Sequence, residues 1–154
     1  MDKIKVLLVD DEEDFVKALA ERIKMRDLDG EIALNGEQAL QIVDNQIPDV
    51  MVLDLRMPGI DGMEVLRRVK KQHPQVQVII LTGHGSEKDE SIARDLGAYE
   101  YHQKPVDIDV LVKTLKGAYE KVKAYEKSME DTMVAATFAQ AGEFDTAKEL
   151  IKKK

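Results

Sequence analysis

The sequence predicts an α/β fold in which helices cover both faces of a five-stranded parallel sheet. Short apolar runs alternate along the chain with longer segments whose apolar residues recur at helical spacing. The run at 50–53 is apolar throughout, which is typical of a strand that is buried on both faces. The length of 154 residues suits one hydrophobic core with a short appendage.

The expected elements follow one another in regular order. Strands are expected at 4–9, 31–34, 50–53, 76–81 and 99–103. Helical segments are expected at 15–25, after Asn35, at 63–71, at 91–96 and from about 107. Asn35 is a good helix cap, and Gly97 is expected to end the fourth helix. In open sheets of this kind ligands bind beyond the carboxyl ends of the strands, so the residues just after each strand are the candidates for a functional site.

Composition excludes several classes of function. The chain has no cysteine, so disulfides, thiolate metal sites and cysteine nucleophiles are excluded. A formal net charge of −7 opposes binding to nucleic acid backbones and to anionic membranes. The N-terminus lacks the pattern of a signal peptide, and no apolar run approaches the roughly 20 residues of a membrane helix. We therefore expect a cytoplasmic protein that binds neither nucleic acid nor membrane.

Acidic side chains and a lysine follow the predicted strands. Asp10 and Asp11 follow the first strand, Asp54 the third, Thr82 ends the fourth, and Lys104 follows the fifth. Three close carboxylates need a counter-charge, and Mg²⁺ with its preference for oxygen ligands supplies one. A carboxylate beside Mg²⁺ is a competent phosphoryl acceptor. The threonine hydroxyl and the lysine ammonium then suit the oxygens of a phosphoryl group.

The chain resembles, from about residue 3 to about residue 119, the receiver domain of bacterial response regulators, in the CheY-like superfamily. The motifs that carry the resemblance are Leu8-Val9-Asp10-Asp11-Glu12, Asp54-Leu55-Arg56-Met57-Pro58-Gly59 with Asp61-Gly62, Leu81-Thr82-Gly83, Gly97-Ala98 and Lys104-Pro105. Any one of them is weak, but five in order make a strong signal. The resemblance implies a flavodoxin-like three-layer α/β/α sandwich with strand order 2-1-3-4-5.

The resemblance also implies roles at the metal site. Asp54 is the phosphoacceptor and one ligand of Mg²⁺. Asp11 binds the ion directly, and Asp10 binds it through water. The backbone carbonyl of Arg56 completes the protein ligands.

Further roles implied by the resemblance concern the phosphoryl group and the switch. Thr82 and Lys104 hold the phosphoryl group, and the Lys104–Pro105 bond is expected to be cis. Tyr101 is expected to turn inward on activation. Arg56 and His84 border the phosphoryl group and tune the rate of its hydrolysis.

Plainer interpretations stay open for each residue. Asp10 and Asp11 can cap a helix, and Asp54 and Thr82 can serve in turns. Lys104 can be solvated. Tyr101 can be ordinary packing. Arg56 and His84 can be exposed polar loop residues.

The C-terminal part is expected to differ from the domain before it. We assign 1–120 to the receiver domain and 121–154 to a helical extension, a hairpin that continues the fifth helix. The fifth helix carries an apolar seam that runs into the extension and is close to a heptad pattern. The seam comprises Leu111, Leu115, Ala118, Val122, Tyr125 and Met129. Gly117 is expected to weaken the helix by about 1 kcal/mol. Residues 141–147 resemble the turn of a tetratricopeptide-type helix pair, and a lone unit must pack on another surface. Dimerisation or partner docking is favoured over a hairpin folded back onto the receiver.

The sequence thus predicts a signalling switch and not a metabolic enzyme. Its expected partners are a sensor histidine kinase or phosphotransfer protein, a downstream protein that the sequence does not name, and a second copy of the chain. Two other classes of function are alternatives. One is a scaffold or dimerisation module that works without phosphorylation. The other is a phosphatase of the haloacid-dehalogenase type, for which the spacing of Asp10 and Glu12 is a thin match.

Overall fold

Strands and helices alternate along the chain, as the apolar periodicity predicts. The computed structural model describes the backbone of residues 3–140 and the side chains of residues 3–135. The strands are β1 Lys5–Val9, β2 Asp29–Ala33, β3 Val50–Leu53, β4 Gln77–Thr82 and β5 Glu100–Gln103. The helices are α1 Glu13–Lys24, α2 Gly36–Asn45, α3 Gly62–Gln72, α4 Glu87–Asp95 and α5 Ile108–Gln140.

The strands form one sheet in the order β2-β1-β3-β4-β5, and all neighbouring strands are parallel. This confirms the flavodoxin-like order 2-1-3-4-5. The second strand begins at Asp29, two residues before the predicted start at Glu31, because its first residues pair with the start of β1. Exposed and half-buried residues at the start of β2 gave no apolar signal there.

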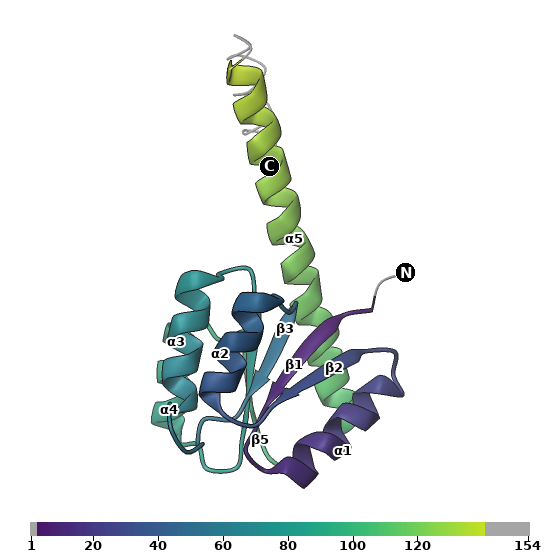
Figure 1. Cartoon of the computed structure of the whole chain (residues 1–154), viewed down its shortest axis with the longest axis vertical. Coiled ribbons are helices and arrows are strands. Elements are labelled where there is room, and N and C mark those ends of the chain that lie inside the picture. The colour runs from purple at the N-terminus through teal and green to yellow at the C-terminus, as the bar shows by residue number, and fades with distance from the viewer. Residues whose placement is uncertain (1–2, 141–154) are drawn as a thin grey trace.

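Helices cover both faces of the sheet and divide the core in two. Helices α2, α3 and α4 lie on one face, and α1 and α5 lie on the other (Figure 1). Successive residues of β1 serve the two faces in turn: Val6 and Leu8 pack with α1 and α5, whereas Leu7 and Val9 pack with α2 and α3. Burial on both faces explains why the central strands are apolar throughout.

Side chains cap the helices on the α2–α4 face. Asn35 accepts a hydrogen bond from the backbone N–H of Gln38, as predicted, and Asp61 accepts one from Glu64. Ser86 and Asp89 form a reciprocal capping box at the start of α4. Helix α1 has no side-chain cap, so Asp10 and Asp11 do not cap it.

Helix α5 runs without a break from the receiver core into the C-terminal extension. Its first turns are buried, down to Val122 at 3% exposure, whereas Tyr125 and Met129 are exposed. The rest of the helix projects away from the sheet (Figure 1). The boundary we placed at residue 120 therefore falls inside one continuous helix. The expected tetratricopeptide-like turn at 141–147 lies outside the described residues.

Gly117 has a packing role that helix propensity alone does not reveal. A Cβ at this position would lie 2.7 Å from the Tyr99 hydroxyl. Glycine thus lets the Tyr99 side chain approach α5 closely.

Within the described part of the chain, no helix is both long enough and apolar enough to cross a bilayer.

Gly62, the first residue of α3, packs against the backbone at the end of β3. A Cβ there would overlap the carbonyl oxygen of Asp54 and lie 2.6 Å from the Cα of Leu55. Backbone atoms cannot move aside as a flexible side chain can. Glycine at this position therefore fixes how closely α3 approaches the strand end that carries Asp54.

We expect Gly62→Ala to lower the free energy of unfolding by about 1–3 kcal/mol, because the new methyl group overpacks against backbone. Urea denaturation measures the change. Gly83→Ala is the matched control, since a Cβ at Gly83 would meet only the Lys104 side chain, at an ordinary 3.8 Å. Equal stabilities of the two variants would contradict this account of Gly62.

Candidate functional site

Asp10 and Asp54 lie side by side at the carboxyl edge of the sheet. Each directly follows one of two paired residues, Val9 of β1 and Leu53 of β3. The backbone N–H of Asp54 also donates to the carbonyl of Val9 at 3.0 Å, which continues the ladder by one residue. Both aspartates are 4% exposed. The strand register therefore forces two carboxylates into one buried position.

Lys104 brings an ammonium group to the same position from β5. Its backbone N–H donates to the carbonyl of Thr82 at 2.9 Å, and the Lys104–Pro105 bond is cis, as the resemblance implies. Its Nζ donates to Asp10 Oδ2 at 2.7 Å and to Glu12 Oε1 at 3.1 Å, and lies 3.8 Å from Asp54 Oδ2. Lys104 is therefore part of the site and is not a solvated surface lysine.

The pKa values of two groups reflect this crowding. Burial raises the pKa of Asp10 above its usual range, and this outweighs the lowering by hydrogen bonds from Lys104 and from the Glu12 backbone N–H. Burial by itself lowers the pKa of Lys104, but hydrogen bonds to Asp10 and Glu12 raise that pKa overall. Lys104 therefore stays charged, while Asp10 holds a proton more readily than an exposed aspartate does.

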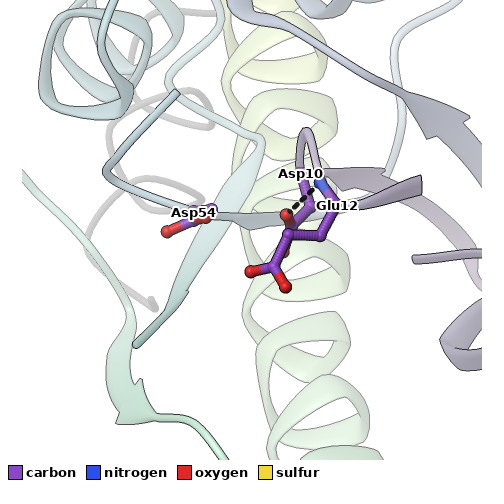
Figure 2. A group of neighbouring side chains, drawn as sticks. All are labelled: Asp10, Glu12 and Asp54. Carbon is purple, nitrogen blue, oxygen red and sulfur yellow. Dashed lines mark hydrogen bonds between the residues drawn. The ribbon is translucent and has the colours of Figure 1, made fainter. Parts of the chain in front are cut away.

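Three carboxylates meet closely enough to hold a metal ion. One oxygen from each of Asp10, Glu12 and Asp54 lies within 4.8 Å of the other two. Figure 2 shows the side chains of Asp54, Asp10 and Glu12 and the hydrogen bond between Asp10 and Glu12. Asp54 follows β3, Asp10 follows β1, and Glu12 is the N-cap of α1, with its N–H donating to Asp10 Oδ1 at 2.9 Å. When all three are ionised, one ammonium leaves two negative charges uncompensated. An all-oxygen set with that charge fits Mg²⁺.

Glu12 is the member of this group to which the sequence assigned no role. The expected ligand Asp11 is exposed and lies outside the group of three. The role of Asp11 as a direct metal ligand stays a prediction. Glu12 gave a signal only as one acid in the run from Asp10 to Asp14, where spacing alone does not say which side chain turns inward.

Thr82 lies inside the site, and the two expected tuning residues lie at its rim. Thr82 is fully buried at the end of β4, and its Oγ1 accepts the His84 backbone N–H at 3.4 Å. The Arg56 backbone N–H donates to Asp54 Oδ1 at 3.3 Å. The side chains of Arg56 and His84 are exposed. Their effect on hydrolysis, and the Arg56 carbonyl as a ligand, stay predictions.

Tyr101 is buried next to Thr82. Its side chain is 7% exposed, and its hydroxyl has no hydrogen-bond partner among the described residues. Burial, followed by the negative charges of Asp89 and Glu90, raises the pKa of Tyr101. A Cβ at Gly85 would overlap the hydroxyl, so glycine is what makes room for the ring. Sequence reasoning did not identify this role of Gly85.

Phe15 is a second residue that the sequence did not assign to the site. Lys104 Nζ lies 4.3 Å from the centroid of its ring, a cation–π contact. Phe15 belongs to α1, so this contact joins the lysine that follows β5 to α1. The helical spacing placed Phe15 on a helix but could not show which side chain it meets.

Comparison with known proteins agrees with the geometry. The family described as response regulator receiver domain matches residues 6–116. An NtrX-like response regulator of Rickettsia typhi is 35% identical over 132 residues, which are 84% of this chain and 28% of that protein. The transcriptional regulatory protein TrcR of Mycobacterium tuberculosis is 32% identical over 130 residues, 84% of this chain and 51% of that one. The chain thus spans about a quarter to a half of these relatives.

Solved structures give the same result. A response regulator receiver domain protein of Clostridium thermocellum superposes with a TM-score of 0.75 at 32% identity and covers 79% of this chain and 98% of its own. The match spans the sheet, all five site motifs and most of the chain before the extension of α5. The chain belongs to the response regulator receiver domain family of two-component systems.

Proposed function

We propose that this chain is a phosphorylation-dependent switch that accepts a phosphoryl group on Asp54. The observation that carries the proposal is the contact set of Lys104, whose ammonium group faces the buried carboxylates of Asp10 and Asp54 and the exposed carboxylate of Glu12. A phosphohistidine of a sensor kinase or phosphotransfer protein is the proposed donor. We place the reaction in the cytoplasm.

The transfer step balances without any further reactant. The Asp54 carboxylate oxygen attacks phosphorus, a P–O bond forms, and the P–N bond to the donor histidine breaks. The electron pair of that bond stays on the imidazole, which takes up a proton. Mg²⁺ held by the carboxylates neutralises charge on the transferring group when it is bound.

The chain's own side chains position and stabilise the new group. The Arg56 N–H already points at Asp54 Oδ1 and fixes the orientation of the carboxylate. Lys104 Nζ lies 3.8 Å from the other carboxylate oxygen, so a small shift brings it onto a phosphoryl oxygen. To make that shift, Lys104 exchanges its carboxylate partners Asp10 and Glu12 for the phosphoryl group. Thr82, next to this position, supplies a hydroxyl donor.

The switch would then pass through Tyr101 and α4. Thr82 contacts the space that Tyr101 occupies, since both lie within 3 Å of a Cβ built at Gly85. Movement of the Thr82 hydroxyl toward a phosphoryl group changes the packing of Tyr101, and α4 follows because it covers this region.

The extension of α5 is the proposed site of self-association. Tyr125 and Met129 continue the apolar seam beyond the receiver core and are 36% and 48% exposed. In a parallel pairing, the heptad pattern sets Lys121 opposite Glu126 of the second copy, a favourable pair.

The main prediction concerns Asp54. We expect acetyl phosphate with Mg²⁺ to add one phosphoryl mass to the wild-type chain and none to Asp54→Asn, because the amide is no acceptor. Intact mass spectrometry measures the gain. Asp29→Asn, an exposed carboxylate at the start of β2, is the control and should gain the mass. No gain in the wild type under saturating donor would favour the phosphorylation-independent scaffold.

A second prediction concerns pH. The raised pKa of Asp10 means that protons compete with the metal already above the pH range in which an ordinary aspartate titrates. Mg²⁺ affinity should therefore fall as the pH is lowered toward that range. The pKa of Lys104 is raised, so this residue stays protonated as the pH is lowered and adds nothing to the pH dependence of Mg²⁺ affinity. Calorimetric titration at several pH values measures the trend. Asp10→Asn should bind more weakly and with a flatter pH profile, and an equally steep profile in that variant would assign the proton to another group.

A third prediction concerns the seam. We expect beryllofluoride, a stable phosphoryl mimic, to shift the wild type toward a dimer in light scattering. The double variant Tyr125→Lys, Met129→Lys should stay monomeric, because a dimer through this seam would bury the new lysine charges. Val110→Lys, equally exposed at 48% but outside the distal seam, is the control and should dimerise. A dimer that persists in the double variant would rule out this seam.

A further inference from the structure

A groove of about 610 Å³ lies between the loop after β3 and helix α4. Met57, Met63 and Ile92 supply apolar lining, and Asp61 and Asp89 supply carboxylates. Ile92 is 38% exposed, large for an isoleucine on a helix that is packed against a sheet. The groove is separate from the carboxylate cluster, because its lining contains none of Asp10, Glu12 and Asp54.

The charges in the groove are held in place. Asp61 accepts the backbone N–H of Glu64 at 3.0 Å, and Asp89 accepts that of Ser86 at 3.0 Å. Both carboxylates are therefore fixed by helix caps and do not swing freely. Arg56 is the one cation in the lining, so acids exceed bases there by two to one. The net charge of −7 adds a long-range attraction for cations.

We propose that this groove docks a segment of a partner protein that presents an aliphatic or aromatic side chain next to a lysine or arginine. The apolar group fills the space between Met57, Met63 and Ile92. The cation meets Asp61 or Asp89 at the edge. An anionic partner meets two fixed carboxylates and is rejected.

Both walls of the groove are joined to the phosphoacceptor. The first wall starts at Leu55, directly after Asp54, and the N–H of its next residue, Arg56, donates to the Asp54 carboxylate. The second wall, α4, follows Thr82 through a short loop, and Ala93 is its only buried residue. Besides Ala93, an exposed ion pair of Arg94 with Glu100 of β5 joins this helix to the sheet, and an exposed pair is a weak tie. Phosphorylation should therefore change the width of the groove, and this part of the inference rests on the proposed function.

The recognition chemistry can be tested with 4-phenylbutylamine, which carries an apolar ring and an ammonium group. We expect it to bind with millimolar affinity, as its size allows, and to shift the NMR methyl signals of Met57, Met63 and Ile92. The carboxylate analogue 4-phenylbutyrate should bind at least about threefold more weakly, since the acids repel it. No shift with the amine up to its solubility limit, or equal binding of both compounds, would overturn the proposal.

Variants locate the binding. Ile92→Lys should abolish the shifts at Met57 and Met63, because it removes the apolar wall and adds a like charge. Val110→Lys on α5 is the matched control and should bind as the wild type does. Asp89→Asn keeps a capping side chain but should erase most of the preference for the amine. Unchanged amine binding in Ile92→Lys would place the compound elsewhere and refute the groove.

The coupling is tested separately. Beryllofluoride with Mg²⁺ should change the amine affinity by about twofold or more. Ile92→Lys should still gain the phosphoryl mass on Asp54, since it lies outside the cluster. An unchanged affinity in a protein that does gain the mass would refute the coupling and leave Asp54 as acceptor. If the wild-type chain does not gain the phosphoryl mass, the proposed function is refuted, and amine binding stands as a separate result.

Discussion

The site depends on an imbalance of charge in a buried position. Three carboxylates face one ammonium at the edge of the sheet, and burial already raises the pKa of Asp10. Such a cluster is stable only when something compensates the excess charge. Lys104 does this in part, through two hydrogen bonds. A divalent cation can do the rest. In the proposed switch, a phosphoryl group on Asp54 would then have to displace the resting contacts of Lys104.

The fold serves this cluster through close backbone approach. Pairing of Val9 with Leu53 sets Asp10 beside Asp54, and Gly62 lets α3 lie directly on the backbone at Asp54. Gly85 in turn gives Tyr101 its buried position. Each of these is a packing requirement, and each bears on a residue with a chemical role. The scaffold and the site are therefore difficult to separate by mutation.

Much of this could be predicted from sequence, for identifiable reasons. Alternation of apolar runs and helical periods revealed the strands and helices, because burial on two faces leaves a strong pattern. Asp54, Thr82 and Lys104 were visible because Asp54 and Lys104 directly follow strands and Thr82 ends one. Glu12 and Phe15 were not assigned, since their roles depend on which way a side chain turns within a helical start. The role of Gly117 was also hidden, because propensity describes the helix alone and Tyr99 comes from another element.

The position of the groove suits the transmission of a change at Asp54 to a partner protein. In the proposed switch, a phosphoryl group on Asp54 would act on the first wall through the Arg56 N–H and on α4 through Thr82. The apolar lining would supply affinity for the proposed partner, and the fixed carboxylates would supply selectivity for cations. Helix α4 has one buried residue, Ala93, and its ion pair between Arg94 and Glu100 is exposed, so little burial holds that wall in place. In the proposed switch, a rearrangement at Thr82 would therefore meet little resistance from packing on its way to the surface where a partner binds.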